Sequence, residues 1–143
     1  MMRRRFGVVI AVLLTLCCVS AGCGRGDPDI SYHDVDVYMF ETDAGFQAVL
    51  EENGLSYQYA NNTVEQYESI KSQLREEDIY VYYHVLGIEE ADKICVVFGY
   101  ADADDYMIQH GYVDEDGNPS REAWQEAAYV WMTQEMAQRK AKQ

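Results

Sequence analysis

The chain has 143 residues, a length that fits one domain rather than two. It carries 11 Lys and Arg against 25 Asp and Glu, so its formal charge is −14 at pH 7. Because the phosphates of nucleic acid attract Lys and Arg, so acidic a chain is predicted to have no nucleic-acid partner. Its 12 tyrosines and its hydrophobic content of 48% argue against a disordered chain.

Residues 1–22 have the three-part pattern of a secretory signal peptide. Arg3, Arg4 and Arg5 precede an apolar run from Phe6 to Val19, and small residues follow it. The run has about 14 residues, fewer than the roughly 20 that a membrane-spanning helix needs. We therefore expect this segment to be removed, which leaves 8 basic and 25 acidic residues and a formal charge of −17.

The end of the segment, Val19-Ser20-Ala21-Gly22-Cys23, resembles the lipobox of bacterial lipoproteins. In that family an aliphatic residue and small residues precede a Cys that becomes the lipidated N-terminus. The resemblance covers residues 1–23. It implies that Cys23 carries a diacylglyceryl group with fatty acids such as palmitate, and that the protein is held on the extracytoplasmic side of a bacterial cell membrane. The alternative is an ordinary cleaved signal that leaves Cys23 as a free thiol.

Residues 23–33 are predicted to form the lipidated end and a flexible tether, because residues 24–29 are rich in Gly, Pro and Asp. About ten residues reach at most ~35 Å when extended, so the domain is expected to work close to the membrane surface. Its negative charge would be repelled by anionic head groups. Residues 34–143 are predicted to form a single small acidic α+β domain.

The first half of this domain is predicted to contain one strand and two helices. Apolar and polar residues alternate from Val35 to Glu41, which is typical of a strand. A helix follows and ends at Asn53-Gly54, where Gly adopts the left-handed conformation without penalty. Thr63 and Gln66 have the spacing of a capping box and predict a second helix that ends near Glu77.

Two apolar runs come next, Ile79 to Leu86 and Ile94 to Tyr100, and both are rich in β-branched and aromatic residues. The link between them is long enough for an antiparallel return and too short for a parallel crossover, so they are predicted to form a hairpin. Cys95 lies in the second run and is predicted to be buried as a small apolar residue. With Cys23 lipidated, no internal disulfide is possible.

The C-terminal part is predicted to hold a short helix at 102–110 that Asp102 or Asp104 caps, a turn at 114–117, and a last helix at 118–141 that Asn118 caps, with Pro119 in its first turn. Trp124 and Trp131 are seven apart in this last helix, so both are expected to be buried against the sheet. The predicted fold is therefore α+β in the order β-α-α-β-β-α-α, with a small antiparallel sheet of about three strands packed with helices.

The sequence offers no set of catalytic residues. His33, His84 and His110 are too far apart in sequence to suggest a metal site, and neither a strained Gly-x-Ser-x-Gly turn nor a Gly-rich phosphate loop occurs. Residues 114–118 resemble part of an EF-hand loop, but both possible registers lack an acidic residue at the last ligand position. We therefore predict no cofactor and no bound metal.

Tyrosine is the unusual feature, and its apolar ring and polar tip suit a binding surface as well as a core. On the predicted strand 79–86, Tyr80, Tyr82 and His84 share one face. Rings about 7 Å apart on a strand suit stacking on a sugar or gripping an extended peptide. The alternative is that these side chains pack beneath the short helix at 102–110.

These observations predict a membrane-anchored envelope lipoprotein that acts as a non-enzymatic binding module, with Tyr80, Tyr82 and His84 as candidate binding residues. Its partner would be an envelope protein, a peptide or a cell-wall polymer. A small envelope hydrolase and an acidic calcium-binding domain are the alternatives.

Overall fold

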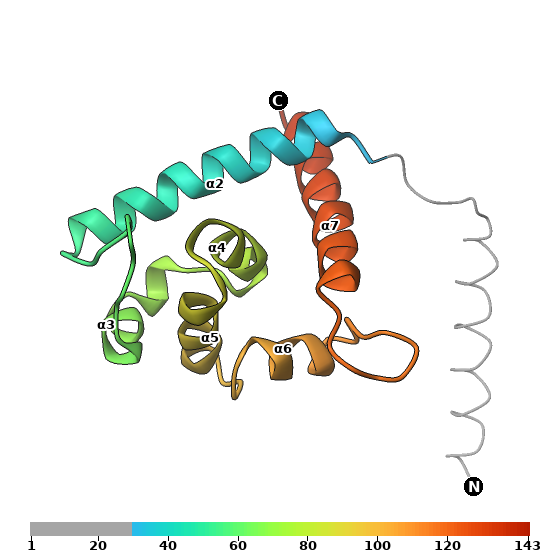
Figure 1. The fold of residues 1–143 in the computed structure, drawn as a ribbon. Helices are drawn as coiled ribbons and strands as arrows, with labels where there is room; N and C mark the ends of the chain where they lie inside the picture. Colours follow the sequence, from blue (N-terminus) through green and yellow to red (C-terminus); the bar gives the residue numbers. More distant parts are fainter. Residues whose placement is uncertain (1–29) are drawn as a thin grey trace, which may run out of the picture. The chain divides into compact units, whose positions relative to one another are not determined.

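The computed structural model describes residues 30–143, and residues 31–143 form one compact unit. The predicted signal peptide, Cys23 and most of the predicted tether lie outside the described residues. The regular structure of the described part is helical, apart from an isolated antiparallel bridge between Val113 and Pro119 (Figure 1). In chain order the elements are α2 (Tyr32–Glu52), α3 (Val64–Ser69), the 3-10 helices η1 (Lys71–Gln73) and η2 (Glu76–Asp78), α4 (Ile79–Leu86), α5 (Ile88–Val97), α6 (Ala103–Gln109) and α7 (Arg121–Ala141).

The predicted α+β fold is therefore wrong, since no strand occurs between residues 30 and 143. The segment 35–41, predicted as a strand, lies in α2. The Ser31 hydroxyl accepts a hydrogen bond from the Asp34 backbone N–H (3.2 Å), and this cap starts the helix at Tyr32, inside the range predicted for the tether. The buried residues of α2 follow the period of a helix: Val35, Tyr38, Phe46 and Leu50.

The two runs predicted as a hairpin are also helical. The first run forms all of α4, whereas residues 94–97 of the second run form the end of α5 and residues 98–100 follow that helix. Helices α4 and α5 pack closely on each other and are joined by Gly87. Because α4 contacts α2, α5 and α7, its first turn, residues 79–82, is buried on every side. A helix enclosed in this way has the same unbroken apolar run as a buried strand, so composition alone did not separate the two.

Several local predictions are confirmed. Thr63 and Gln66 form the capping box, although α3 ends at Ser69, well before Glu77. Asp102 caps α6 by accepting a hydrogen bond from the backbone N–H three residues later (2.8 Å). Cys95 is fully buried, but in a helix rather than a strand.

The last helix begins three residues later than predicted, because Ser120 rather than Asn118 caps it. Trp124 is buried as expected, with 2% of its surface exposed. Trp131 is only half-buried, so the prediction for this residue is wrong. Both indoles face other helices, since the sheet that they were expected to cover does not exist.

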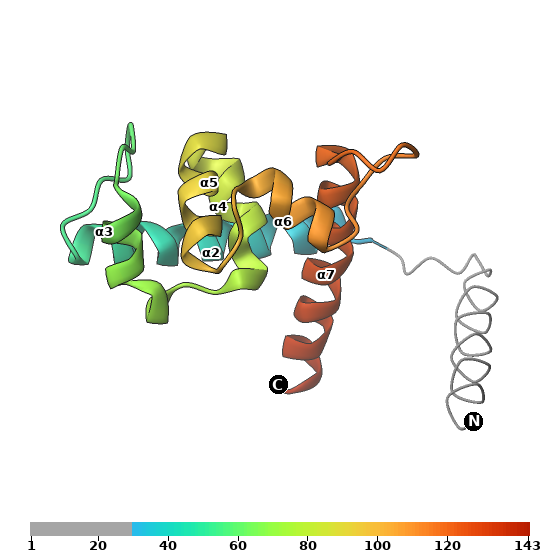
Figure 2. The ribbon, with the colours of Figure 1, turned by 90° about the horizontal axis from the view of Figure 1, so that it is seen from below.

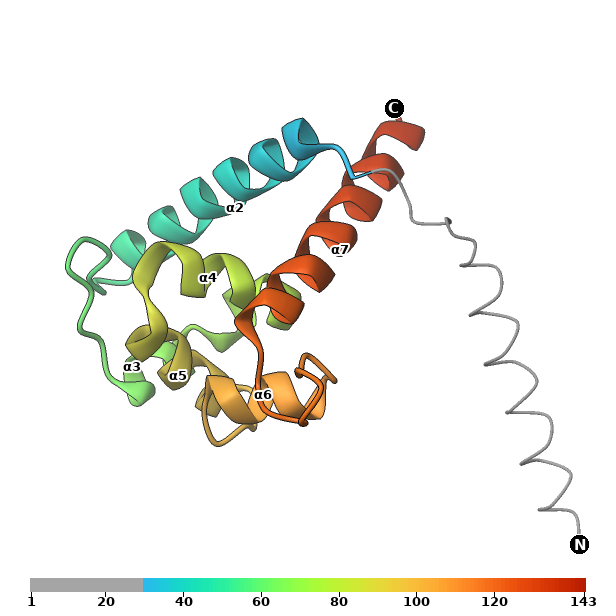
Figure 3. The ribbon, with the colours of Figure 1, turned by 45° about the vertical axis from the view of Figure 1, so that its right-hand side comes forward.

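Helices α2 and α7 are the longest elements of the described part, and they approach each other near the start of α2 (Figures 2 and 3). Tyr38 meets Trp131 edge to face there, with ring centroids 5.4 Å apart. The Lys140 ammonium lies 2.9 Å from the Asp34 carboxylate. Farther along, both helices contact α4, which therefore lies at the centre of the packing. None of the helices within residues 30–143 has the length and apolar character needed to cross a membrane.

Candidate ligand-binding pocket

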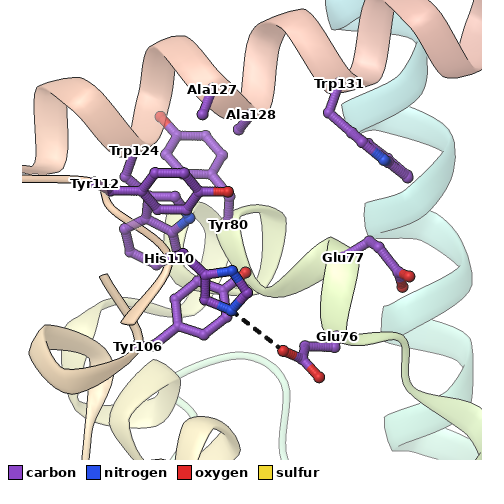
Figure 4. Close-up of a pocket in the computed structure, with 10 residues that line it drawn as sticks. All are labelled: Glu76, Glu77, Tyr80, Tyr106, His110, Tyr112, Trp124, Ala127, Ala128 and Trp131. Carbon is purple, nitrogen blue, oxygen red and sulfur yellow. Dashed lines mark ion pairs between the residues drawn. The ribbon is translucent and has the colours of Figure 1, made fainter. Parts of the chain in front are cut away.

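A pocket of about 290 Å³ lies where η2, α4, α6 and α7 meet (Figure 4). We call it the aromatic pocket, because five aromatic rings make most of its wall: Tyr80, Tyr106, Tyr112, Trp124 and Trp131. The remaining lining side chains are Glu76, Glu77, His110, Ala127 and Ala128. These residues come from distant parts of the sequence, so the pocket exists only in the folded chain.

The hollow arises from the order of large and small residues along α7. Each of two tryptophans lies three or four positions from two alanines, so all four side chains share one face of the helix. This face consists of Trp124, Ala127, Ala128 and Trp131. The two indoles project at the ends of this face, and the alanines between them are too short to fill the space (Figure 4). An aromatic-Ala-Ala-aromatic pattern at helical spacing was the sequence signal for this wall.

The inner wall is held by contacts between the rings. Tyr80 meets Trp124 edge to face, with centroids 5.3 Å apart, and Tyr106 lies 5.6 Å from the same indole. All three side chains are buried. Burial raises the pKa of Tyr80 to about 12 and raises that of Tyr106 as well, so both hydroxyls stay protonated near neutral pH. The wall is therefore uncharged and formed before any ligand arrives.

The rim is polar and more exposed. The His110 Nε2 atom lies 3.0 Å from the Tyr100 hydroxyl and 3.4 Å from Glu76 Oε2. The Tyr100 hydroxyl donates a 2.5 Å hydrogen bond to Glu76, and this bond is the main reason that the pKa of Tyr100 rises to about 12. Glu77 lies on the same side of the pocket, 3.7 Å from the Arg75 Nε atom (Figure 4).

This arrangement can hold a ligand against its aromatic rings. His110, Tyr100 and Glu76 form a cluster of hydrogen-bonding groups at the rim. However, the side chains that line the pocket in the described part of the chain include no Ser, Thr, Cys or Lys that would act as a nucleophile. What the wall does offer is an aromatic surface with carboxylates at one end.

The structure separates Tyr82 from the other two predicted binding residues, Tyr80 and His84. Tyr80 lines the aromatic pocket, whereas Tyr82 is buried on another side of α4, with its ring 4.2 Å from that of Phe46 and its hydroxyl accepting from the Arg75 N–H. Residues two apart share a face in a strand but lie about 200° apart in a helix. The prediction that Tyr80 and Tyr82 share a face was therefore wrong. His84 is exposed and stacks on Tyr80 outside the aromatic pocket. The binding role of the three stays a prediction.

The acidic turn at 114–118, which resembles part of an EF-hand loop, is closed by its own hydrogen bonds. Asp114 accepts from the backbone N–H groups of Asp116 and Asn118 at 2.9 and 3.0 Å. Across residues 30–143, no group of three or more His, Cys, Asp and Glu side chains is placed to hold a metal ion.

Comparison with known proteins gives no family: no protein-family model, curated protein or solved structure matches the chain.

Proposed function

We propose that this protein is a bacterial envelope lipoprotein, anchored through Cys23 on the extracytoplasmic side of the membrane, whose helical domain binds a ligand in the aromatic pocket. The anchor is supported by the basic, apolar and small-residue pattern of residues 1–23. The binding role is carried by one observation, the aromatic pocket itself. The partner presents a compact group to this pocket and is an envelope protein, a peptide or a cell-wall polymer.

The size and rigidity of the pocket support this role. Its volume of about 290 Å³ lies near the lower end of the range for small-molecule sites. Trp124, Tyr80 and Tyr106 hold each other in place, so little side-chain entropy is lost when a ligand binds. A pre-formed aromatic wall fits a module that recognises and holds its ligand.

A fragment screen by NMR tests the proposal. The chain has two tryptophans, and both line the pocket, so their indole N–H signals report on it directly. We would use the mature chain with Cys23→Ala, which dissolves without detergent, and a panel of neutral, cationic and anionic fragments. We expect some fragments to shift both indole signals.

Ala128→Phe places a ring inside the pocket and should abolish these shifts. Ala137→Phe is the matched control, because Ala137 is an exposed residue of the same helix and takes no part in the pocket. If no fragment shifts an indole signal, or if the shifts persist in Ala128→Phe, the pocket is not a binding site and the proposal fails.

A further inference from the structure

The charged side chains that line the aromatic pocket are mainly negative. Its lining contains two carboxylates and no Lys or Arg. The Glu76 side chain is 36% exposed and that of Glu77 is 55% exposed, so both carboxylates reach solvent at the same end of the pocket. Each carboxylate also has a basic neighbour: the Arg75 side chain lies 3.7 Å from Glu77, and His110, which lines the pocket as well, lies 3.4 Å from Glu76. A cation entering the pocket is attracted, and an anion is repelled.

The aromatic wall favours the same sign of charge. The face of an aromatic ring attracts a cation, and Trp does so most strongly. One such contact is already present, since the Arg75 guanidinium lies over the Trp131 ring at 5.6 Å from its centroid. Trp131 lines the pocket together with the rings of Trp124 and Tyr112 (Figure 4).

The polar groups of the pocket decide which kind of cation fits. A primary ammonium has three N–H donors and a guanidinium has five, and each donor needs an acceptor when it is buried. The pocket offers its carboxylates at one end only, and the rest of its lining consists of aromatic rings, three tyrosine hydroxyls, the His110 imidazole and two alanine methyl groups. An alkylated ammonium has few or no N–H donors and turns methyl groups toward the rings, so it leaves no donor unsatisfied.

We infer that the aromatic pocket binds a quaternary or similarly alkylated ammonium group, held between the Trp124, Trp131 and Tyr112 rings with Glu76 and Glu77 balancing its charge. This inference rests on the function proposed above and names its ligand class. Such a group can belong to a free solute or to a lipid head group of the membrane next to the domain.

The test compares choline with 3,3-dimethylbutan-1-ol, which has the same shape but a carbon atom in place of the charged nitrogen. Binding to the mature Cys23→Ala chain is followed through the indole signals of Trp124 and Trp131. We expect choline to bind at least about tenfold more tightly than the neutral alcohol, a difference that cation–π contacts together with nearby carboxylates can supply.

Two variants test which side chains provide the preference for choline over the neutral alcohol. Glu77→Gln should weaken choline binding by about two- to fivefold and leave the alcohol unchanged. Glu68→Gln makes the same change of charge on an exposed residue of α3 outside the pocket, so it should leave both affinities unchanged. Trp131→Leu keeps an apolar side chain but removes the ring, and it should weaken choline by about fivefold or more. Melting curves confirm that each variant is folded.

Vesicles distinguish an alkylated ammonium group of a free solute from one of a lipid head group. Free choline is compared with vesicles of phosphatidylcholine and with vesicles in which half of this lipid is replaced by phosphatidylethanolamine, whose ammonium is not methylated. Binding of free choline that vesicles do not compete with assigns the site to a solute. Competition that follows the phosphatidylcholine content assigns it to a head group. Both results support an alkylated ammonium ligand.

Failure of this inference is separable from failure of the proposed function. If the alcohol binds as tightly as choline and Ala128→Phe abolishes both, the pocket is a binding site and the charge selectivity is wrong. The same holds if neutral or anionic fragments bind while choline does not. If no compound of any charge binds, the proposed function fails and the inference fails with it.

Discussion

The Glu90 carboxylate is buried, with 3% of the residue exposed, and it joins α5 to the segment before α3. It accepts hydrogen bonds from the Tyr67 hydroxyl (2.6 Å), the Lys93 ammonium (2.8 Å) and the Asn62 backbone N–H (3.2 Å). Burial alone would raise the pKa of Glu90. The bonds from Lys93, Tyr67 and Asn62 outweigh it and hold this pKa below its ordinary value.

Replacing Glu90→Gln should lower the free energy of unfolding at pH 7 by about 2–4 kcal/mol, because an amide cannot satisfy three donors and leaves Lys93 without its charge partner. The pH dependence has a definite sign. A carboxyl group with a lowered folded-state pKa stabilises the fold above its unfolded-state pKa, and this stabilisation is lost as the pH falls through the folded-state value. Urea unfolding at pH 7 and pH 3 should therefore show a smaller acid loss in the variant than in the wild type.

The control for this prediction is Glu89→Gln, an exposed neighbour in the same first turn of α5. It should leave stability at pH 7 within about 0.5 kcal/mol of the wild type. Equal acid losses in wild type and Glu90→Gln would show that the hydrogen-bonded carboxylate does not set the pH response.

Single-residue signals in the sequence were reliable where the interaction was local. The capping box of Thr63 and the cap at Asp102 each join atoms within three residues, so the sequence alone contained everything needed to predict them. The buried Cys95 was also predicted correctly from its apolar neighbours. The grouping of Tyr80 with Tyr82 failed because it depended on the type of element, which neighbours farther along the chain decide.

Helix α4 shows why the element types were mispredicted. Its sequence, Ile79 to Leu86, is rich in β-branched and aromatic residues, which favour strands. A short helix of this composition has little stability of its own and depends on packing against other elements. Here α2, α5 and α7 supply that packing. Tertiary packing therefore decided that this segment is a helix, and the apolar runs in 79–86 and 94–100 gave no information about that packing.

The junction between α4 and α5 gives a test at this scale. Gly87 has φ 99° and ψ 173°, a conformation that is essentially restricted to Gly. A Cβ atom there would meet nothing within 4 Å, so the cost of a side chain is backbone strain alone. Gly87→Ala should lower the free energy of unfolding by about 1–3 kcal/mol.

Gly45→Ala is the matched control, because Gly45 lies inside α2 and its Cβ would also meet nothing within 4 Å. In a regular helix the same substitution should stabilise the fold by about 0.5–1 kcal/mol. Thermal or urea unfolding of both variants measures the contrast. If Gly87→Ala proves neutral or stabilising, the sharp turn at this junction does not require glycine.

At the scale of the whole molecule, the aromatic pocket lay beyond what the sequence could predict. The face formed by Trp124, Ala127, Ala128 and Trp131 is visible as a helical pattern. Nothing in the sequence indicates that Tyr80, Tyr106 and the carboxylates of η2 close over that face, because the contacts between α4, α6 and α7 fix their positions. The pattern that resembles a lipoprotein signal, in contrast, consists of consecutive residues, so it can be recognised without knowledge of the fold.

The anchor gives the last prediction. In the intact bacterium, wild-type protein should incorporate labelled palmitate and partition into the detergent phase with membrane proteins, because two or more acyl chains hold a protein stably on a bilayer. Cys23→Ala should lose both properties. Cys95→Ala is the matched control, since it removes the buried cysteine and leaves Cys23 in place, so label and partitioning should persist. If Cys23→Ala stays with the membrane as wild type does, the lipobox is not used, and the domain must be held there by another contact. Because the domain begins at Tyr32, about nine residues after Cys23, a lipid at that position would keep the aromatic pocket near the membrane, and its loss would release the pocket with the domain.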